Sequence, residues 1–540
     1  MWVFVMDDLK SLIEGDTPAG LLSQESSVSP PPSTSPPAGG APLDWGIAPQ
    51  YSPPPPPAPE MPVTAGEEET LVIPPAAPNA NPFIPQGVTS AEQNGVQTPP
   101  AAGNPWFKRI VMIIIFFLVL LGVGIGVKYI LGMVNGGKEV TITYWGLWED
   151  GPTIQNAITD FQTVNPKIKV QYVKQSLHQY RERLQAAITR GDGPDVFQFH
   201  NTWVPMLRNE LSPAPATFMT VAEFGTTFYP VASSDLVGGQ VIYGVPLMFD
   251  GLGLYYNEDL FTAAAVKPPT TWPELLDIVP KLTVKTDTQI QQSAIALGTT
   301  GNVENFSDIA GFMMIQNGAR LASPTGKEAE DTLTFYRKFA NPSDPVYTWN
   351  ETMDNSIYAF ATSRVAMILA PSWRAFEIKQ INPNLHFKIA PVPQLPGNTV
   401  NWASYWTGGV STKSKYQPQA WLFLKYLISR DTMTKLYAEE SKSRLFGEPY
   451  ARVDLGSTLL ADPYVGAYIQ GAPTAKSFPL ASRTFDNGIN DKLIQYMTDA
   501  VNAVGQGTAP SAALQTAAAG FFQVLTSYGL ASGTAPATTP

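Results

Sequence analysis

Hydrophobic and polar residues follow two different periods in the central part of the chain. Apolar residues alternate with polar ones over residues 140–144 and 168–172, which predicts two strands. Apolar side chains recur at helical spacing over residues 154–164 and 180–188, which predicts two helices. A short apolar run at residues 195–199 predicts a third strand. The order strand, helix, strand, helix, strand is typical of a parallel sheet with helices packed on it.

A longer apolar run precedes these elements, uncharged over residues 110–127 and continuing through Val134. At about 1.5 Å per residue, a helix over residues 108–134 is long enough to cross a bilayer core of about 30 Å. We therefore expect a transmembrane helix that contacts the lipid bilayer through residues 110–134. A cleaved signal peptide fits poorly, because its apolar stretch would lie near the start of the chain.

Charges beside this run indicate its orientation. Lys108 and Arg109 stand directly before it, whereas Lys128 lies near its far end and Lys138 beyond it. The positive-inside rule favours the side with Lys108 and Arg109 as cytoplasmic. We therefore expect a single-pass protein of the cell membrane, with a cytoplasmic N-terminus and an extracellular or periplasmic globular part.

The segment before the run is acidic and rich in proline. Residues 1–107 hold eleven acids and one base, and residues 17–105 hold 23 of the 51 prolines. Such a composition cannot bury enough apolar surface to offset its chain entropy, so we expect a disordered tail. Residues 1–14 fit either a short helix that binds a cytoplasmic partner or a frayed terminus. Residues 531–540 are expected to form a disordered C-terminus.

Composition excludes several classes of site. The chain has no cysteine, which rules out disulfides, thiolate metal sites and a lipid-bearing cysteine. Its three histidines form no H-E-x-x-H pair, and no cofactor or metal is expected. Outside the tail the chain holds 34 acids and 33 bases, with no basic stretch that would indicate nucleic-acid binding.

Aromatic and hydrogen-bonding residues follow two of the predicted strands. Residues 145–150 come after the first strand, and residues 200–203 after the third. Ligands of open parallel sheets bind outside the carboxyl ends of the strands. Indole rings can stack on the C–H faces of a sugar, while carboxylates and amides pair with its hydroxyls. The candidate contacts chosen from position and chemistry are Trp148, His200, Asn201, Trp203, Trp402, Tyr405 and Trp406.

Four motifs, in this order along the chain, carry a family resemblance. They are Gly191-Asp192-Gly193-Pro194-Asp195-Val196; Tyr243-Gly244-Val245-Pro246 with Gly253–Phe261 and Thr271–Leu275; Val365-Ala366-Met367-Ile368 with Pro371-Ser372-Trp373; and Tyr405-Trp406-Thr407-Gly408-Gly409-Val410. Together they resemble the extracellular solute-binding proteins of ABC importers, in the carbohydrate-binding group that includes maltose-binding protein. The resemblance covers residues 139–530. It departs from the family at Ser363-Arg364, where a glycine and a lysine are usual, and after the third strand, where a maltose-like contact set is missing.

The resemblance implies a two-lobe α/β fold of the periplasmic-binding-protein type (type II) with a hinge. Residues 138–530 would form this domain, with crossings between the lobes near residues 247–253, 404–410 and 446–455. By the same resemblance, Trp145, Asp250 and Trp373 would contact the ligand.

The resulting functional hypothesis is a membrane-anchored receptor, not an enzyme. It would capture a sugar or oligosaccharide in the cleft between its lobes and deliver it to the membrane subunits of an ABC importer. One alternative is a ligand sensor that signals through the tail to a cytoplasmic partner. Another is a glycoside hydrolase, which would need two suitably separated carboxylates.

Overall fold

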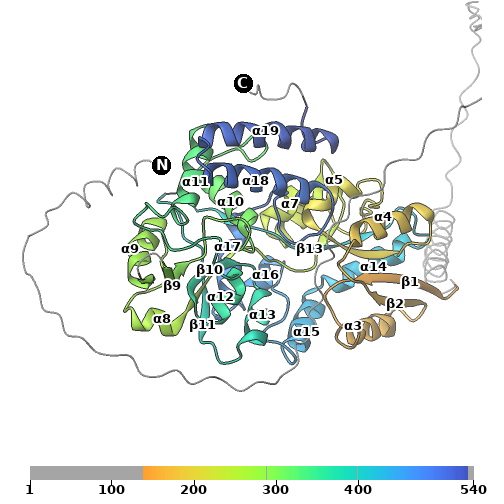
Figure 1. Cartoon of the computed structure of the whole chain (residues 1–540). Coiled ribbons are helices and arrows are strands. Elements are labelled where there is room, and N and C mark those ends of the chain that lie inside the picture. The colour runs from red at the N-terminus through yellow and green to blue at the C-terminus, as the bar shows by residue number, and fades with distance from the viewer. Residues whose placement is uncertain (1–137, 287–288, 398, 533–540) are drawn as a thin grey trace, which may run out of the picture. The chain divides into compact units, whose positions relative to one another are not determined.

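The computed structural model describes residues 138–286, 289–397 and 399–532. Two five-stranded sheets organise these residues, and helices cover both (Figure 1). The predicted transmembrane helix and the acidic tail lie outside the described residues. Among the helices that the structure describes, none is both long and apolar enough to cross a membrane.

The first sheet begins with the strands expected from residue alternation. In spatial order its strands are β2 (Ile168–Lys174), β1 (Val140–Gly146), β3 (Val196–His200), β13 (Trp406–Val410) and β6 (Val245–Pro246). Strands β2, β1 and β3 are parallel, as the sequence predicts. Strand β13 runs antiparallel to β3, with Trp406 opposite His200. The start of β13 and the carboxyl end of β3 therefore meet at one edge.

The second sheet is built mostly from the middle of the chain. In spatial order its strands are β11 (Phe387–Ala390), β7 (Gly253–Asn257), β10 (Val365–Ala370), β9 (Gln289–Ile295) and β8 (Val284–Thr286). Strand β10 is buried at every position, which agrees with its uninterrupted apolar sequence. Two short pairs complete the strands: β4 (Val237–Gly238) with β5 (Val241–Ile242), and β12 (Asn401–Trp402) with β14 (Ala475–Lys476).

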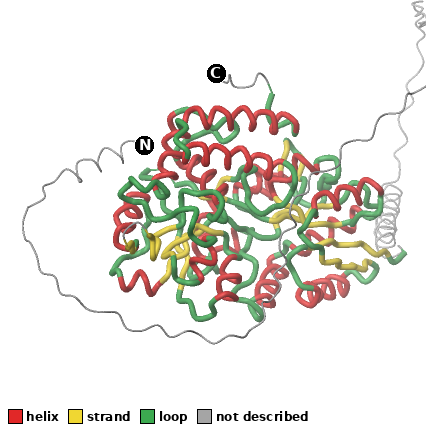
Figure 2. Tube along the Cα trace, in the orientation of Figure 1, coloured by secondary structure: helices red, strands yellow, loops and turns green. Residues whose placement is uncertain are grey.

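Helices pack on each sheet (Figure 2). Those before β7, together with the first two after β13, are α3 (Gly151–Val164), α4 (Tyr180–Arg190), α5 (Val204–Leu207), α6 (Val221–Thr227), α7 (Pro230–Leu236), α14 (Gln417–Leu427) and α15 (Arg430–Glu440), with the short η1 (Asn201–Trp203). The others are α8 (Glu258–Ala263), α9 (Trp272–Leu282), α10 (Phe306–Gln316), α11 (Lys327–Lys338), α12 (Ser356–Ala361), α13 (Arg374–Ile381), α16 (Val453–Gly456), α17 (Gly466–Gly471), η2 (Ala472–Thr474), α18 (Ile489–Gly505) and α19 (Pro510–Ser527). Figure 1 shows α18 and α19 side by side, and both contact α11.

The connections between the two sheets position the site. Residues 247–252 lead from β6 in the first sheet to β7 in the second. Residues 403–405 lead into β13, and the backbone N–H of Ser404 donates to the carbonyl of Asp250 at 3.0 Å. A third segment, residues 441–452 between α15 and α16, lies against the first, because the N–H of Phe249 donates to the carbonyl of Pro449 at 2.8 Å. These bonds hold three chain segments together between the sheets.

Candidate functional site

A cavity of about 290 Å³ opens between the two sheets. One wall comes from the edge where β1 and β3 end, and the opposite wall from the carboxyl end of β10 and the start of α10. The connection 248–252 forms part of its floor, and residues 482–485 close another side. The cavity therefore lies where ligands of parallel strands bind, at the carboxyl ends.

Asp250 places a carboxylate in this cavity from the first connection. It accepts hydrogen bonds from the N–H of Gly251 at 2.8 Å and from the N–H and Oγ of Ser372 at 3.0 and 2.9 Å. Burial raises the pKa of Asp250 to about 7, although hydrogen bonds from Ser372 and Gly251 lower it. Asp250 thus joins the first connection to the segment after β10. It also lines the cavity, where a ligand can contact it.

Aromatic rings line the wall on the side of the first sheet. Trp148 lies edge-on to Trp406, with 5.2 Å between ring centroids, and Trp406 also contacts His200 at 5.3 Å. Trp203 supports Trp406 from behind at 5.3 Å and is fully buried. Trp148 remains 36% exposed, so its ring is available to a ligand.

His200 contributes a neutral polar group to the same wall. Its Nδ1 lies 2.8 Å from Oγ1 of Thr202 and its Nε2 lies 3.1 Å from Oγ of Ser404. Burial lowers the pKa of His200 to about 3. The imidazole therefore stays uncharged at neutral pH and serves as a hydrogen-bonding group.

Trp373 lines the opposite wall, directly after the turn that ends β10. Its ring is 39% exposed, whereas the next residue, Arg374, is almost completely buried. The guanidinium carbon of Arg374 lies 4.1 Å from the centroid of the Trp373 ring. A buried cation against one side of the indole leaves the rest of the ring for the cavity.

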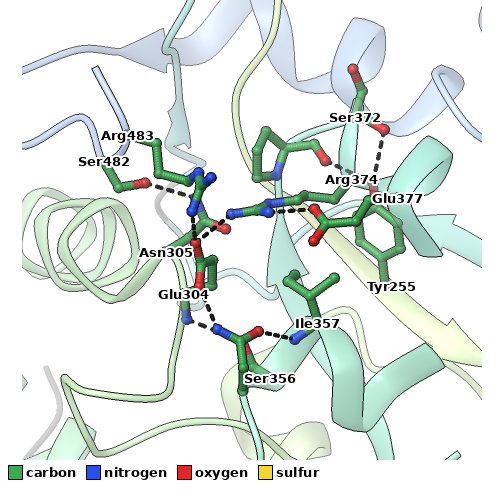
Figure 3. A network of polar contacts seen from close by, with 12 residues as sticks. Tyr255, Glu304, Asn305, Ser356, Ile357, Ser372, Arg374, Glu377, Ser482 and Arg483 are labelled. Atoms are coloured by element: carbon green, nitrogen blue, oxygen red, sulfur yellow. Dashed lines mark hydrogen bonds and ion pairs between the residues drawn. The ribbon is translucent and has the colours of Figure 1, made fainter. Parts of the chain in front are cut away.

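An ion-pair network holds Arg374 in place (Figure 3). Arg374 pairs with Glu304 at 2.9 Å and also with Glu377, and Arg483 pairs with the same Glu304. Burial alone would raise the pKa of Glu304, but Arg374, Asn355 and Arg483 bring it below its ordinary value. Glu304 therefore ties Arg374, on the β10 side, to Arg483, on the segment before α18.

Five of the ten predicted contacts lie in the cavity lining: Trp148, His200, Asp250, Trp373 and Trp406. The other five, Trp145, Asn201, Trp203, Trp402 and Tyr405, are outside it.

Physical reasons account for the five residues outside the lining. Trp145 lies within β1 and is half-buried against the core. Asn201 and the hydroxyl of Tyr405 both donate to the carboxylate of Asp235, at 2.8 and 2.7 Å, so they point away from the cavity. Trp203 is packed behind Trp406. Trp402 is buried and donates from Nε1 to Asp308 at 2.8 Å. Trp203 and Trp402 therefore support lining residues from behind.

Several lining residues were missed at the level of sequence. They are Leu177, Met248, Gly251, Leu252, Asn305, Asp308, Pro371, Ser404, Arg444, Glu448, Ser482, Arg483, Thr484 and Phe485. One signal was available: Asp308 is the single charged residue in the mostly apolar α10. A buried charge inside such a helix indicates a polar partner or a site.

Comparison with known proteins identifies the family. The model of the bacterial extracellular solute-binding protein family matches residues 145–434, which is more than half of the chain. The chain belongs to this family. The multiple sugar-binding protein of Streptococcus mutans is 25% identical to this solute-binding protein over 316 residues, covering 55% of the chain and 73% of the relative. Membership confirms the prediction of a binding protein rather than an enzyme.

Solved structures confirm the two-lobe fold of this solute-binding protein. A cyclo/maltodextrin-binding protein complexed with maltotetraose matches with a TM-score of 0.58 and 19% identity, covering 72% of this chain and 98% of that one. A solute-binding protein of Thermotoga lettingae bound with α-D-tagatose matches with a TM-score of 0.56 and 22% identity, covering 72% and 100%. At these identities the likeness shows the fold.

Proposed function

We propose that this solute-binding protein captures a sugar or oligosaccharide in the cavity between its two sheets. The observation that carries the proposal is that two exposed indoles, Trp148 and Trp373, and the Asp250 carboxylate line one cavity. Indoles stack on sugar C–H faces, and a carboxylate accepts hydroxyl hydrogen bonds. The same ligand class is supported by the relative described as a multiple sugar-binding protein and by the two matched structures, which hold maltotetraose and α-D-tagatose.

Binding would be coupled to a change in the angle between the lobes. The lining comes from both walls and from the connections between them, so a ligand contacts all three at once. It therefore favours the closed arrangement to the extent that this arrangement binds it more tightly. The closed form would dock on the membrane subunits of an ABC importer.

Anchoring would come from the sequence before the domain. In this proposal residues 108–134 cross the membrane, residues 1–107 form a cytoplasmic disordered tail and residues 138–530 bind the ligand outside. The apolar run at 110–127 and the charges beside it support this arrangement. Binding of a cytoplasmic partner to the tail would favour a sensor over a receptor that only supplies an importer.

Isothermal titration of the full chain in detergent tests the function. Neutral mono- and oligosaccharides, amino sugars, amino acids and polyamines form the panel. We expect micromolar binding by one sugar class and no product after prolonged incubation. Binding of amino acids alone, or turnover of an oligosaccharide, would contradict the proposal.

A further inference from the structure

Two buried carboxylates line the cavity without a cationic partner among the described residues. Asp250 is bonded to Gly251 and Ser372, as described above. Asp308 accepts from Nε1 of Trp402 at 2.8 Å and from the N–H of Ser482 at 3.0 Å. All of these donors are neutral, and burying a carboxylate with neutral donors alone is costly.

A third acidic group lies beside these carboxylates. Arg444 pairs with Glu440 at 2.7 Å and with Glu448 at 2.9 Å, and Glu448 lines the cavity. Glu149 lies behind the same wall, where burial and then Glu448 raise its pKa. One guanidinium therefore serves three acidic groups, and burial raises the pKa of Glu440 to about 8.

The other cation of the lining is already occupied. Arg483 pairs with Glu304, which also binds Arg374. His200 is neutral, because burial lowers its pKa to about 3. Within the described lining, no lysine, arginine or charged histidine is left to balance Asp250 and Asp308.

An unmet acceptor lies beside these carboxylates. Oδ1 of Asn305 is buried, and no hydrogen-bond partner for it lies among the described residues. Asn305 lines the cavity, as do the rings of Trp148, Trp373, Trp406 and Phe485. Acceptors and aromatic faces around an acidic cavity favour a ligand rich in N–H donors and positive charge.

We propose that the ligand is an amino sugar, bound through a protonated amine that faces Asp250 and Asp308 while its ring stacks on the tryptophans. This inference rests on the proposed function and narrows its substrate class. An ammonium group supplies three donors and no acceptor, which matches the carboxylate oxygens. A neutral sugar would instead favour the protonated carboxyl groups, because burial raises the pKa of both Asp250 and Asp308.

Proton release gives the proposal a distinct signature. Asp250 has a pKa of about 7, so at neutral pH part of the free protein carries a proton there. An incoming ammonium favours the ionised carboxylate, which releases that proton to the buffer. Of the neighbouring titratable groups, Glu448 raises the pKa of Asp250. Asp250 in turn raises the pKa of Tyr255 and of Tyr468, both neutral at neutral pH, and Arg374 lowers that of Tyr255.

A matched ligand series tests the inference on the full chain. The β-1,4-linked dimers of glucosamine, N-acetylglucosamine and glucose differ only at C2, and the corresponding monomers of the gluco, galacto and manno series extend the set. We expect an amine member to bind at least about tenfold more tightly than its acetylated and hydroxyl counterparts. Its binding heat should change with the ionisation enthalpy of the buffer, as proton release requires.

The variant Asp250→Asn separates charge from shape. Its Oδ1 can keep the two backbone N–H bonds, and its amide can donate to Oγ of Ser372. We expect Asp250→Asn to lose the preference for the amine and the buffer-dependent heat, whereas Asp331→Asn on α11 keeps both.

Equal or tighter binding by the hydroxyl or acetylated sugars of the series overturns the inference and leaves sugar capture intact. Absence of binding by every amine overturns it as well, and the wider neutral-sugar panel then decides the function separately.

Discussion

The guanidinium of Arg374 lies 4.1 Å from the ring centroid of Trp373, the residue that precedes it. Arg374 is buried, whereas Trp373 is 39% exposed. Arg374 is held by Glu304 and Glu377, so its position is fixed before any ligand arrives. The indole is therefore preorganised, which reduces the entropy that binding must offset.

Trp373→Ala should weaken ligand binding by more than about tenfold, because it removes a stacking surface. The domain should stay folded, since Trp373 lies at the surface of the cavity and is not part of the buried core. Titration calorimetry and thermal unfolding of the same sample measure both effects. Tyr358→Ala, which removes an exposed ring of α12 outside the lining, should leave affinity unchanged. Unaltered affinity in Trp373→Ala would remove this ring from the site.

The segment before α18 carries backbone strain at the cavity. Arg483, Phe485 and Asn487 have φ values of 59°, 47° and 48°, in the left-handed region that disfavours side chains with a Cβ. Asp486, between two of them, caps α18 through bonds to the N–H groups of Gly488 and Asn490. Phe485 lines the cavity and is 46% exposed, so its ring contributes little to packing. Strain at such a position is typical of a functional segment.

Phe485→Ala and Phe485→Gly separate strain from ligand contact. Both should weaken binding equally, because both lose the ring. The glycine variant should be more stable than the alanine variant by about 0.5–1 kcal/mol, since glycine tolerates positive φ at some cost in unfolded-state entropy. Urea unfolding without ligand measures this difference. An alanine variant of equal or greater stability would show that the backbone there is unstrained.

Local patterns predicted the three parallel strands of the first sheet, because alternation and helical spacing depend on neighbouring residues. Prediction of the site was partial for a different reason. His200 and Asn201 are adjacent, as are Tyr405 and Trp406, yet within each pair one faces the cavity and the other binds Asp235. Position after a strand indicates the edge of the sheet but not the side chain's direction.

The acidic lining depends on contacts that no local pattern contains. Asp308 accepts from Ser482, which is 174 residues away in sequence, and Glu304 pairs with Arg483, 179 residues away. Only tertiary packing brings these segments together. The single charge in α10 was the signal that sequence reasoning could have used.

The orientation proposed for the membrane helix can be tested on intact cells. Protease added outside should degrade residues 138–530 and leave the tail of residues 1–107 protected, because Lys108 and Arg109 favour the cytoplasmic side. Antibodies against an epitope inserted in each region would detect the fragments. Loss of the tail epitope with retention of the domain would reverse the orientation, and the same digestion after lysis shows that both regions can be cleaved.

Asp250 should make the stability of the free protein fall as pH rises. Its pKa in the folded protein is about 7, against about 3.9 in an unfolded chain. The folded state therefore binds more protons between these values, so the stabilisation is complete below about pH 4 and is lost as pH rises through about 7. The slope from this one group is at most about 1.4 kcal/mol per pH unit.

We expect urea unfolding between about pH 5 and pH 8 to show a steeper loss of stability for the unaltered protein than for Asp250→Asn. Asp331→Asn should keep the original slope, because Asp331 pairs with Lys327 on α11 and does not line the cavity. Equal slopes in the unaltered protein and in Asp250→Asn would show that Asp250 is already ionised across this range, and the proton release expected on amine binding would then be absent as well.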